Sequence, residues 1–457
     1  MSRYTSVTDA DRRAMLEQIG VGSVKELFAD IPQGLRLERP LALEEGRCEQ
    51  EVYAELRALA KRNVSTEDEL CFLGGGMYDH YVPALVDAIT SRSEFLTPYT
   101  PYQPEVSQGG LQAMFEYQTA ICELTGLPVS NASLYEGPSA VVAAAWVARA
   151  ETGRRRLVVS RGVHPHAREA LRTLAHAWEM EVSEAPLSDG CTRLGELDDE
   201  VAAVIVSQPN FLGAVEDLQA AAAAAHDAGA LCIASCDPLA LALLRTPGEC
   251  GVDIAVGEGQ PLGNHLAYGG PSFGFFATTQ RLLRRVPGRI VGETRDVDGR
   301  RGFVLTLQTR EQHIRRERAT SNICTAQALN ALAAVIHLSW LGRRGFVELC
   351  ELIVARTAYA RERLAALDGV SPLHERPVVR EFALTLDAPV GEVIERCAAA
   401  GVNPGYALAR DYPEHPDGLL VAITERRTRA DIDRLAETLG AAVAAARTRS
   451  ATGRGAT

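Results

Sequence analysis

Lysine is almost absent from this chain of 457 residues. The chain contains 47 basic residues, but only Lys25 and Lys61 are lysines, and both lie in its first part. A lysine amine is the group that forms Schiff bases with carbonyl compounds. Arginine cannot replace it, because its guanidinium group stays protonated. Covalent chemistry on a lysine is therefore excluded for every residue after 61.

Motifs for metal binding and for several common enzyme classes are also missing. The 10 cysteines include no C-x-x-C pair, so buried reduced thiols are a better interpretation than a metal site or disulfides. His164 and His166 have no third ligand near them in the sequence, which favours a loop or pocket wall over a metal centre. No P-loop, G-x-S-x-G or H-E-x-x-H motif occurs, so nothing supports a kinase or hydrolase. We predict no metal site.

The sequence has no long apolar run. Its first residues contain no apolar signal core, and apolar runs such as residues 220–225 fall well short of a membrane span. The net charge of −12 and the isoelectric point near 5.4 argue against nucleic-acid and anionic-membrane partners. We therefore expect a soluble cytoplasmic protein.

Four regions can be distinguished by pattern. Residues 1–65 are predicted to form a helical arm that clasps a partner. Strands and helices alternate between residues 155 and 280, which predicts a large α/β domain with a mostly parallel sheet over residues 66–330. Residues 331–447 predict a smaller α+β domain. Residues 448–457 are small and polar, and they predict a disordered tail.

A strand–loop–strand unit over residues 251–277 resembles a known functional element. Val252, Ile254 and Val256 alternate as in a strand, a glycine-rich loop follows, and residues 273–277 predict a second strand. In pyridoxal-phosphate (PLP) enzymes of the aminotransferase-like class, fold type I, such a unit carries the Schiff-base lysine. This loop contains no lysine. The chain thus resembles a PLP enzyme without the residue that binds the cofactor covalently.

Two other segments match positions at which this class binds PLP. Residues 131–140, with Ser133, precede an apolar helix, and the start of a helix is a typical anion pocket. Glu136 lies within this segment and would oppose a phosphate. Asp237 ends a predicted strand, where the class keeps the aspartate that pairs with the pyridine nitrogen, although an aspartate before proline is also an ordinary turn residue.

Residues 95–109 form the most unusual segment. Pro98, Pro101 and Pro104 hold the segment extended, so its side chains project from a stiff backbone. We predict that it forms the wall of a site or an interface; the alternative is a rigid surface connection. The interface or partner-site candidates are Tyr99, Tyr102, Gln103, Glu105 and Ser107.

Together these segments make the chain resemble the P-proteins of the glycine cleavage system, in the form split into two chains, and in particular subunit 1 of glycine dehydrogenase (decarboxylating). The resemblance covers residues 5–445. Its most specific stretches are residues 73–76, 95–109, 115–119, 131–135, 209–213, 257–263 and 299–308.

The resemblance implies an enzyme made with a second chain. In that family the sister chain, glycine dehydrogenase subunit 2, carries the PLP lysine, and Gln260 of this chain falls at about the lysine's place. The implied reaction is glycine decarboxylation, with transfer of the aminomethyl group to the lipoyl arm of H-protein, by glycine dehydrogenase (aminomethyl-transferring). This chain alone would bind no PLP covalently and would be inactive.

The family also implies a pair of heterodimers. Ser133, Glu136, Asp237 and Gln260 would then form a vestigial pocket, with no catalytic residue. A hypothesis of another class stays open: a stand-alone binding or regulatory protein that kept the fold of a PLP enzyme without catalysis.

Overall fold

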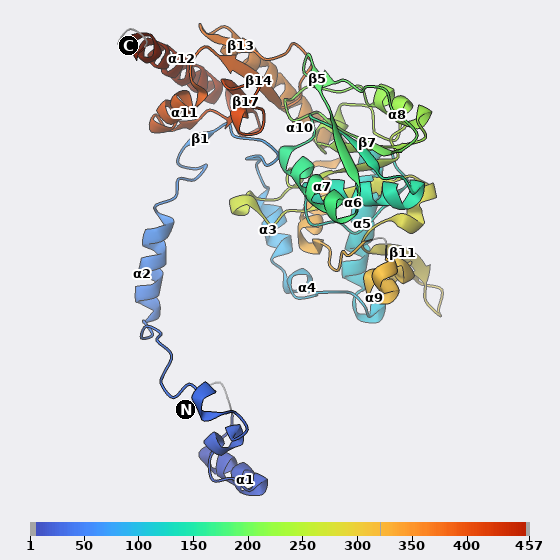
Figure 1. The fold of residues 1–457 in the computed structure, drawn as a ribbon, viewed down its shortest axis with the longest axis vertical. Coiled ribbons are helices and arrows are strands. Elements are labelled where there is room, and N and C mark those ends of the chain that lie inside the picture. The colour runs from blue at the N-terminus through green and yellow to red at the C-terminus, as the bar shows by residue number, and fades with distance from the viewer. Residues whose placement is uncertain (1–5, 320, 454–457) are drawn as a thin grey trace. The chain divides into compact units, whose positions relative to one another are not determined.

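The computed structural model describes residues 6–319 and 321–453, the last five of them by backbone alone. The chain divides into two compact units, Met1–Val64 and Ser65–Thr457 (Figure 1). Within the described residues, no helix has the length and apolar character needed to cross a membrane.

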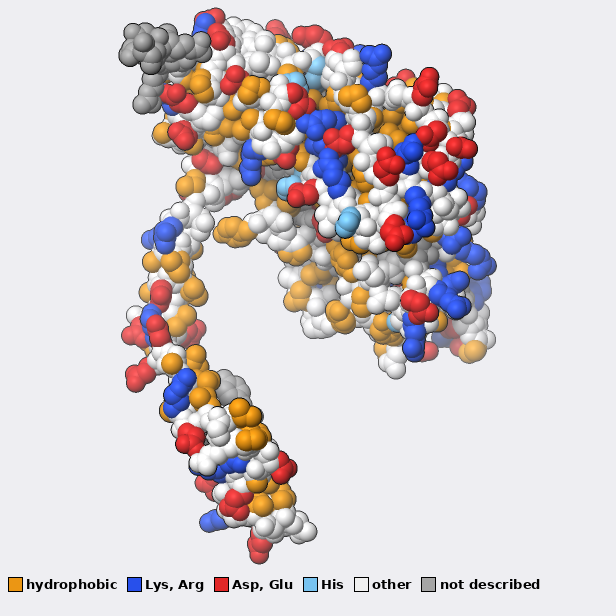
Figure 2. Space-filling model, viewed as in Figure 1, with side chains coloured by type: hydrophobic (Ala, Val, Ile, Leu, Met, Phe, Trp, Pro, Cys, Tyr) orange, Lys and Arg blue, Asp and Glu red, His pale blue; other side chains and the backbone are white. Residues whose placement is uncertain are grey.

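The first unit is a helical arm whose described residues, from 6 on, form no buried core. It contains α1 (Asp9–Ile19), α2 (Glu49–Ala60) and two short 3₁₀ turns, Val24–Phe28 and Gln33–Leu35, and none of these elements buries a side chain. Helix α1 begins with a capping box, in which the Thr8 hydroxyl accepts from Asp11 N–H at 3.2 Å. Apolar side chains are exposed along the whole arm (Figure 2).

The second unit is built on a seven-stranded sheet. Its strands are β2 (Val129–Ser130), β3 (Arg156–Ser160), β4 (Glu181–Ala185), β7 (Val201–Gln208), β8 (Leu231–Cys236), β9 (Ile254–Glu258) and β10 (Gly274–Thr278). Their order is β2-β10-β9-β8-β7-β3-β4. The run from β9 to β4 is parallel, whereas β10 is antiparallel to both of its neighbours.

Helices cover both faces of this sheet because alternate strand residues point to opposite sides. On one face, Val159, Ile205 and Ile233 pack with α6 (Gly137–Thr152) and α7 (Pro165–Ala177). On the other face, Val158 and Val204 pack with α5 (Gln108–Thr125), α8 (Leu218–Asp227) and α10 (Ala328–Ala365). Burial on both faces explains why these strands are almost entirely apolar.

A second, antiparallel sheet follows. Its order is β13 (Val370–Pro372), β14 (Glu381–Leu386), β17 (Gly418–Ala422) and β16 (Tyr406–Ala407). It packs with α11 (Val390–Ala399), α12 (Arg429–Gly453) and the second half of α10. Strand β1 (Leu70–Cys71) pairs in parallel with β15 (Val402–Asn403). The sequence pattern predicts two helices, near 326–341 and 344–367. The structure joins them in α10, which is interrupted at Gly342, where φ is 62°.

The remaining elements are short. They are α3 (Ala84–Thr90), α4 (Ser93–Leu96), α9 (Gln312–Arg315), the pair β5 (Leu187–Ser188) and β6 (Cys191–Thr192), and the hairpin β11 (Ile290–Arg295) and β12 (Arg301–Thr306).

Three features differ from what the sequence pattern indicates. The apolar run of residues 239–245 predicts a helix, but the structure has only a 3₁₀ turn there, Ala240–Ala242. The hairpin of β11 and β12 was not anticipated within its charged sequence, although the turn residues Asp298-Gly299 are typical of hairpins. Helix α12 continues to Gly453, beyond the expected end at 447; residues 454–457 of the expected disordered tail lie outside the described residues.

Candidate functional site

Gln260 follows β9 and is fully engaged by other parts of the chain. Its side chain is 1% exposed. Its Nε2 donates to the carbonyl oxygens of Tyr78 at 3.0 Å and Asn264 at 2.8 Å, and its Oε1 accepts from Tyr78 N–H at 3.0 Å. Both N–H groups of the Gln260 side-chain amide are therefore used as donors. The amide pairs with the backbone N–H and carbonyl of Tyr78 much as a neighbouring β-strand would. Neither N–H donor of the amide is left for a ligand.

The N-terminus of α6, the expected phosphate position, is occupied by carboxylates of the chain itself. Glu136 is the N-cap, and its carboxylate accepts from Ser139 N–H at 2.9 Å and from the Ser139 hydroxyl. Glu258 Oε2 accepts from Gly137 N–H at 3.0 Å. Burial raises the pKa of Glu258 in spite of these donors. The helix amides that attract anions are thus already paired.

Ser133 is turned towards another segment. It is buried, with φ at 110°, and its hydroxyl accepts from Gln327 N–H at 2.9 Å, just before α10 begins. The structure brings Glu136 and Gln260 together through Glu258, whose Oε1 accepts from Gln260 N–H at 3.0 Å. Among the residues that the structure describes, Ser133 hydrogen-bonds to Asn131 and Gln327 and not to these two.

Asp237 directly follows β8 and faces an arginine that sequence reasoning missed. Its Oδ2 lies 2.7 Å from Nε of Arg380, although the N–H does not point along this line, and the two side chains are 12% and 4% exposed. The Arg380 guanidinium also lies 3.3 Å from the centre of the Tyr78 ring. Asp237 therefore has an internal counter-charge. Arg380 directly precedes β14 of the other sheet, and nothing local in the sequence marks it as a partner.

The space left between these groups is small. It measures about 90 Å³ and is lined by residues that include Gly76, Tyr78, His164, Asp237 and Arg380. Pockets for drug-sized ligands and cofactors usually measure about 300–1,000 Å³. The site contains no primary amine that could form a Schiff base, no unpaired N–H group at the start of α6, and little free volume. The residues present therefore do not fit PLP.

Of the two histidines expected in a loop or pocket wall, His164 connects the start of α7 to the loop at Gly75. His164 Nε2 lies 2.7 Å from the Gly75 carbonyl oxygen, and His164 Nδ1 accepts from His166 N–H at 3.1 Å. Burial lowers the pKa of His164 to about 4. Among the residues that the structure describes, no group of three or more metal-ligating side chains is found.

Residues 95–109 lie at the surface beside an apolar groove. Tyr99 and Tyr102 are 81% and 56% exposed, Gln103 and Glu105 are also exposed, and Ser107 is half-buried before α5. The segment is not extended throughout: α4 takes up its first two residues, Pro104–Val106 forms a 3₁₀ turn, and α5 starts at Gln108. The groove measures about 380 Å³ and also borders α5 and α10.

Two contacts hold this segment in place, and neither was anticipated. Gln108 Nε2 donates to the carbonyl oxygens of Pro104 and Phe303, and its Oε1 accepts from Phe303 N–H at 2.9 Å. The buried Arg289 donates to the Tyr102 hydroxyl at 3.4 Å, and its guanidinium lies 5.6 Å from the Tyr102 ring centre. Phe303 lies in β12 and Arg289 directly precedes β11. The contact between residues 95–109 and this hairpin could therefore be found only from the fold.

Comparison with known proteins identifies the family. The family model of the glycine cleavage system P-protein matches residues 2–439. This chain belongs to the P-protein family. Proteins described as probable glycine dehydrogenase (decarboxylating) subunit 1 match it over almost their whole length. The one from Desulforamulus reducens is 50% identical over 96% of this chain and 99% of its own, and the one from Bacillus subtilis is 47% identical over 96% and 98%.

Solved structures agree with this assignment. The crystal structure of an inhibitor-bound glycine decarboxylase (P-protein) of the glycine cleavage system superposes with a TM-score of 0.89 at 45% identity, over 96% of this chain and 100% of that one. A sphingosine-1-phosphate lyase of Burkholderia pseudomallei superposes with a TM-score of 0.62 at 19% identity, over 93% and 96% of the chains. The second similarity shows a shared fold. Within the P-protein family, this chain therefore combines the PLP-enzyme fold with a site that its own residues fill.

Proposed function

We propose that this chain is the lysine-free subunit of a two-chain glycine decarboxylase. The observation that carries the proposal is Gln260, which lies buried at about the place of the PLP lysine with its amide fully hydrogen-bonded. The relatives that match over almost their whole length are described as subunit 1 of such an enzyme. A first subunit without a usable cofactor site requires a second chain that has one.

The two chains would have different roles in the reaction. The sister chain, glycine dehydrogenase subunit 2, would hold PLP, which serves as the electron sink when glycine loses carbon dioxide. The remaining aminomethyl group would pass to the lipoyl arm of H-protein, in the cytoplasm. This chain would complete the sister's site and stabilise the assembly. We propose a pair of heterodimers.

Two surfaces support a protein partner. The arm exposes apolar side chains in each of its helices, including Met15, Phe28 and Leu56. The groove beside residues 95–109 is flanked by the exposed Tyr99 and Val106. Aromatic and aliphatic side chains at such positions are typical anchors of protein interfaces.

Co-expression with the sister chain tests the proposal. We expect the two chains to co-elute on gel filtration and to catalyse exchange between glycine and bicarbonate, whereas this chain alone shows no exchange. A sister chain whose PLP lysine is replaced by alanine is the matched control: it should still assemble, without exchange. Failure of the wild-type chains to associate would instead favour a stand-alone binding or regulatory protein.

A further inference from the structure

The segment from Leu73 to Tyr81, here called the glycine strap, runs through the site just described. Two of its glycines are required by close packing. A Cβ on Gly74 would lie 2.3 Å from Glu381 Oε1, and one on Gly76, where φ is 109°, would lie 2.7 Å from His164 Nε2. Only a chain without side chains at these positions can lie this close to the surrounding residues.

One side of the glycine strap is bound by the seven-stranded sheet and its loops. Gln260 pairs with both the N–H and the carbonyl of Tyr78, each at 3.0 Å. His164 lies 2.7 Å from the Gly75 carbonyl oxygen. His164 lines the remaining space of about 90 Å³, and Gln260 lies next to it. The glycine strap thus takes up part of the volume in which a ligand of this fold would be expected.

The other side is bound by the antiparallel sheet. Glu381 Oε1 accepts from Gly75 N–H at 2.7 Å, and its Oε2 accepts from the Tyr78 hydroxyl at 2.5 Å. The Arg380 guanidinium lies against the Tyr78 ring. Burial, followed by the negative charge of Glu381, raises the pKa of Tyr78 well above its usual value, so the phenol remains a donor.

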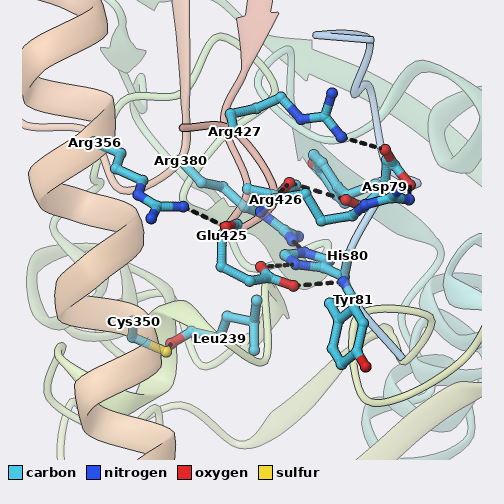
Figure 3. Close-up of polar contacts among 12 residues, drawn as sticks. Asp79, His80, Tyr81, Leu239, Cys350, Arg356, Arg380, Glu425, Arg426 and Arg427 are labelled. Atoms are coloured by element: carbon cyan, nitrogen blue, oxygen red, sulfur yellow. Dashed lines mark hydrogen bonds and ion pairs between the residues drawn. The ribbon is translucent and has the colours of Figure 1, made fainter. Parts of the chain in front are cut away.

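The end of the strap is held by the loop after β17 (Figure 3). Asp79 pairs with Arg426 and, at 2.7 Å, with Arg427. His80 Nδ1 lies 2.7 Å from Glu425 Oε2, and its Nε2 lies 2.7 Å from Arg380 Nη1. A guanidinium can only donate, so Nε2 accepts and Nδ1 carries the proton. Tyr81 N–H donates to Glu425 Oε1 at 2.5 Å.

The glycine strap leads directly into the surface proposed to meet the partner. Val82, immediately after it, and Phe95, at the start of residues 95–109, pack against the same small cluster, in which Val86, Leu332 and Ile336 are buried. A displacement at Tyr81 would therefore be passed through α3 to Phe95. Packed cores transmit such displacements because they have few voids.

We infer that the glycine strap is a permanent internal plug of the former ligand site, and that Gln260, Arg380 and Glu381 are positioning residues that hold residues 95–109 in their partner-binding arrangement. The part concerning the partner rests on the proposed function. The buried polar groups of this site therefore hydrogen-bond to the chain's own backbone, in place of a ligand.

Hydrogen–deuterium exchange on the isolated full chain tests the plug without the partner. Gln260→Leu removes three hydrogen bonds at similar side-chain size. We expect peptides covering residues 73–81 and 95–109 to exchange about tenfold faster or more, as the loss of buried hydrogen bonds predicts. Gln219→Leu, at an exposed position of α8, is the matched control and should leave both peptides unchanged.

Assembly and ligand binding provide the second readout. With the sister chain, Gln260→Leu should raise the dissociation constant about tenfold at unchanged circular dichroism, and neither variant should take up added PLP. If Gln260→Leu does not fold, His80→Ala, which removes the contacts of this side chain to Glu425, Arg380 and the Tyr78 ring, gives the same test. Faster exchange at 73–81 with unchanged exchange at 95–109 would overturn the positioning role, and PLP uptake by Gln260→Leu would overturn the plug. Both outcomes are independent of whether the wild-type pair is active.

Discussion

At the scale of single residues, Gln260 does more than mark a missing lysine. Replacing it by lysine would bury an ammonium group against the Tyr78 N–H, which is itself a donor. We expect Gln260→Lys to lower the free energy of unfolding by about 2–4 kcal/mol, because the amide's bonds are lost and a charge is desolvated. It should also bind no PLP. Urea unfolding and the absorbance of covalently bound PLP measure the two effects.

A lysine at an exposed position is the matched control for the lysine at position 260. Gln219→Lys, on the exposed side of α8, should change the free energy of unfolding by less than about 0.5 kcal/mol. If Gln260→Lys were as stable as this control and took up PLP, the remaining pocket would be larger and more adaptable than its about 90 Å³ indicates.

His164 gives a prediction about pH. Its Nδ1 accepts from His166 N–H, and burial lowers its pKa from 6.5 to about 4. Because the folded-state value is the lower one, the unfolded chain binds the proton more tightly, and His164 stabilises the fold fully only above pH 6.5. Between pH 7 and pH 5 we expect it to account for a loss of about 2 kcal/mol.

Urea unfolding at the two pH values measures this loss. His164→Gln cannot take up a proton, so its loss of stability between pH 7 and pH 5 should be smaller than that of the wild type by about the same 2 kcal/mol. His166→Gln, beside it at an exposed position, should retain the wild-type pH dependence. Equal pH dependence in all three proteins would show that His164 can be protonated without cost.

The residue scale also shows what sequence reasoning can reach. Gln260, Glu136 and Asp237 could be singled out because each lies at a defined place in a strand–loop or loop–helix pattern. Arg380 and Tyr78 could not, because their importance comes from contacts between segments far apart in the chain. The charge of Glu136 was enough to predict that it opposes an anion. Only the structure shows that Glu136 is itself the N-cap of α6.

At the scale of elements, residues 95–109 present two exposed tyrosines at the surface. Tyr99 is 81% exposed, so Tyr99→Ala should leave the isolated chain folded by circular dichroism. It should weaken binding to the sister chain, or turnover of the assembled enzyme, by about 1–3 kcal/mol, as for an aromatic anchor that becomes buried. Titration of the two chains and the glycine–bicarbonate exchange rate measure this.

Tyr102→Ala should have a further effect, because it also removes the hydroxyl to which the buried Arg289 side chain donates. We expect it to lower the stability of the isolated chain by about 1 kcal/mol, which Tyr99→Ala does not. Tyr268→Ala, at a tyrosine that is 97% exposed elsewhere, is the control. Wild-type assembly and turnover by both variants would leave residues 95–109 as a surface connection.

The elements themselves were largely predictable, because burial on both faces makes the parallel strands continuous apolar runs and the helices that follow show a helical period. The prediction failed where this signal is weak. Strands β11 and β12 bury only part of each face, and their charged residues masked the alternation. The bend at Gly342 was foreseen as a gap between two helices, since glycine has no preference for helical geometry.

At the scale of the whole molecule, the arm and the remaining chain differ in how they can be stable. The helices and turns of the arm bury no side chain, whereas residues from 65 on contain both sheets and all of the core clusters described. Apolar side chains exposed in every helical segment of the arm gain free energy only when another surface covers them, by about 1.5–3 kcal/mol for each large side chain that becomes fully buried.

Deleting residues 1–64 separates these contributions. We expect the shortened chain to keep the urea midpoint of the full-length protein, because the deleted segment contributes no buried side chain from its helices. Its dissociation constant for the sister chain should rise at least about tenfold, the effect of about 1.4 kcal/mol. A fourfold variant, Met15→Ser, Phe28→Ser, Leu56→Ser and Leu59→Ser, keeps the arm but removes exposed apolar groups and should have a similar effect. A shortened chain that unfolds at lower urea, or that assembles as tightly as the full-length chain, would show that the arm belongs to this chain's own fold or is not needed for the partner.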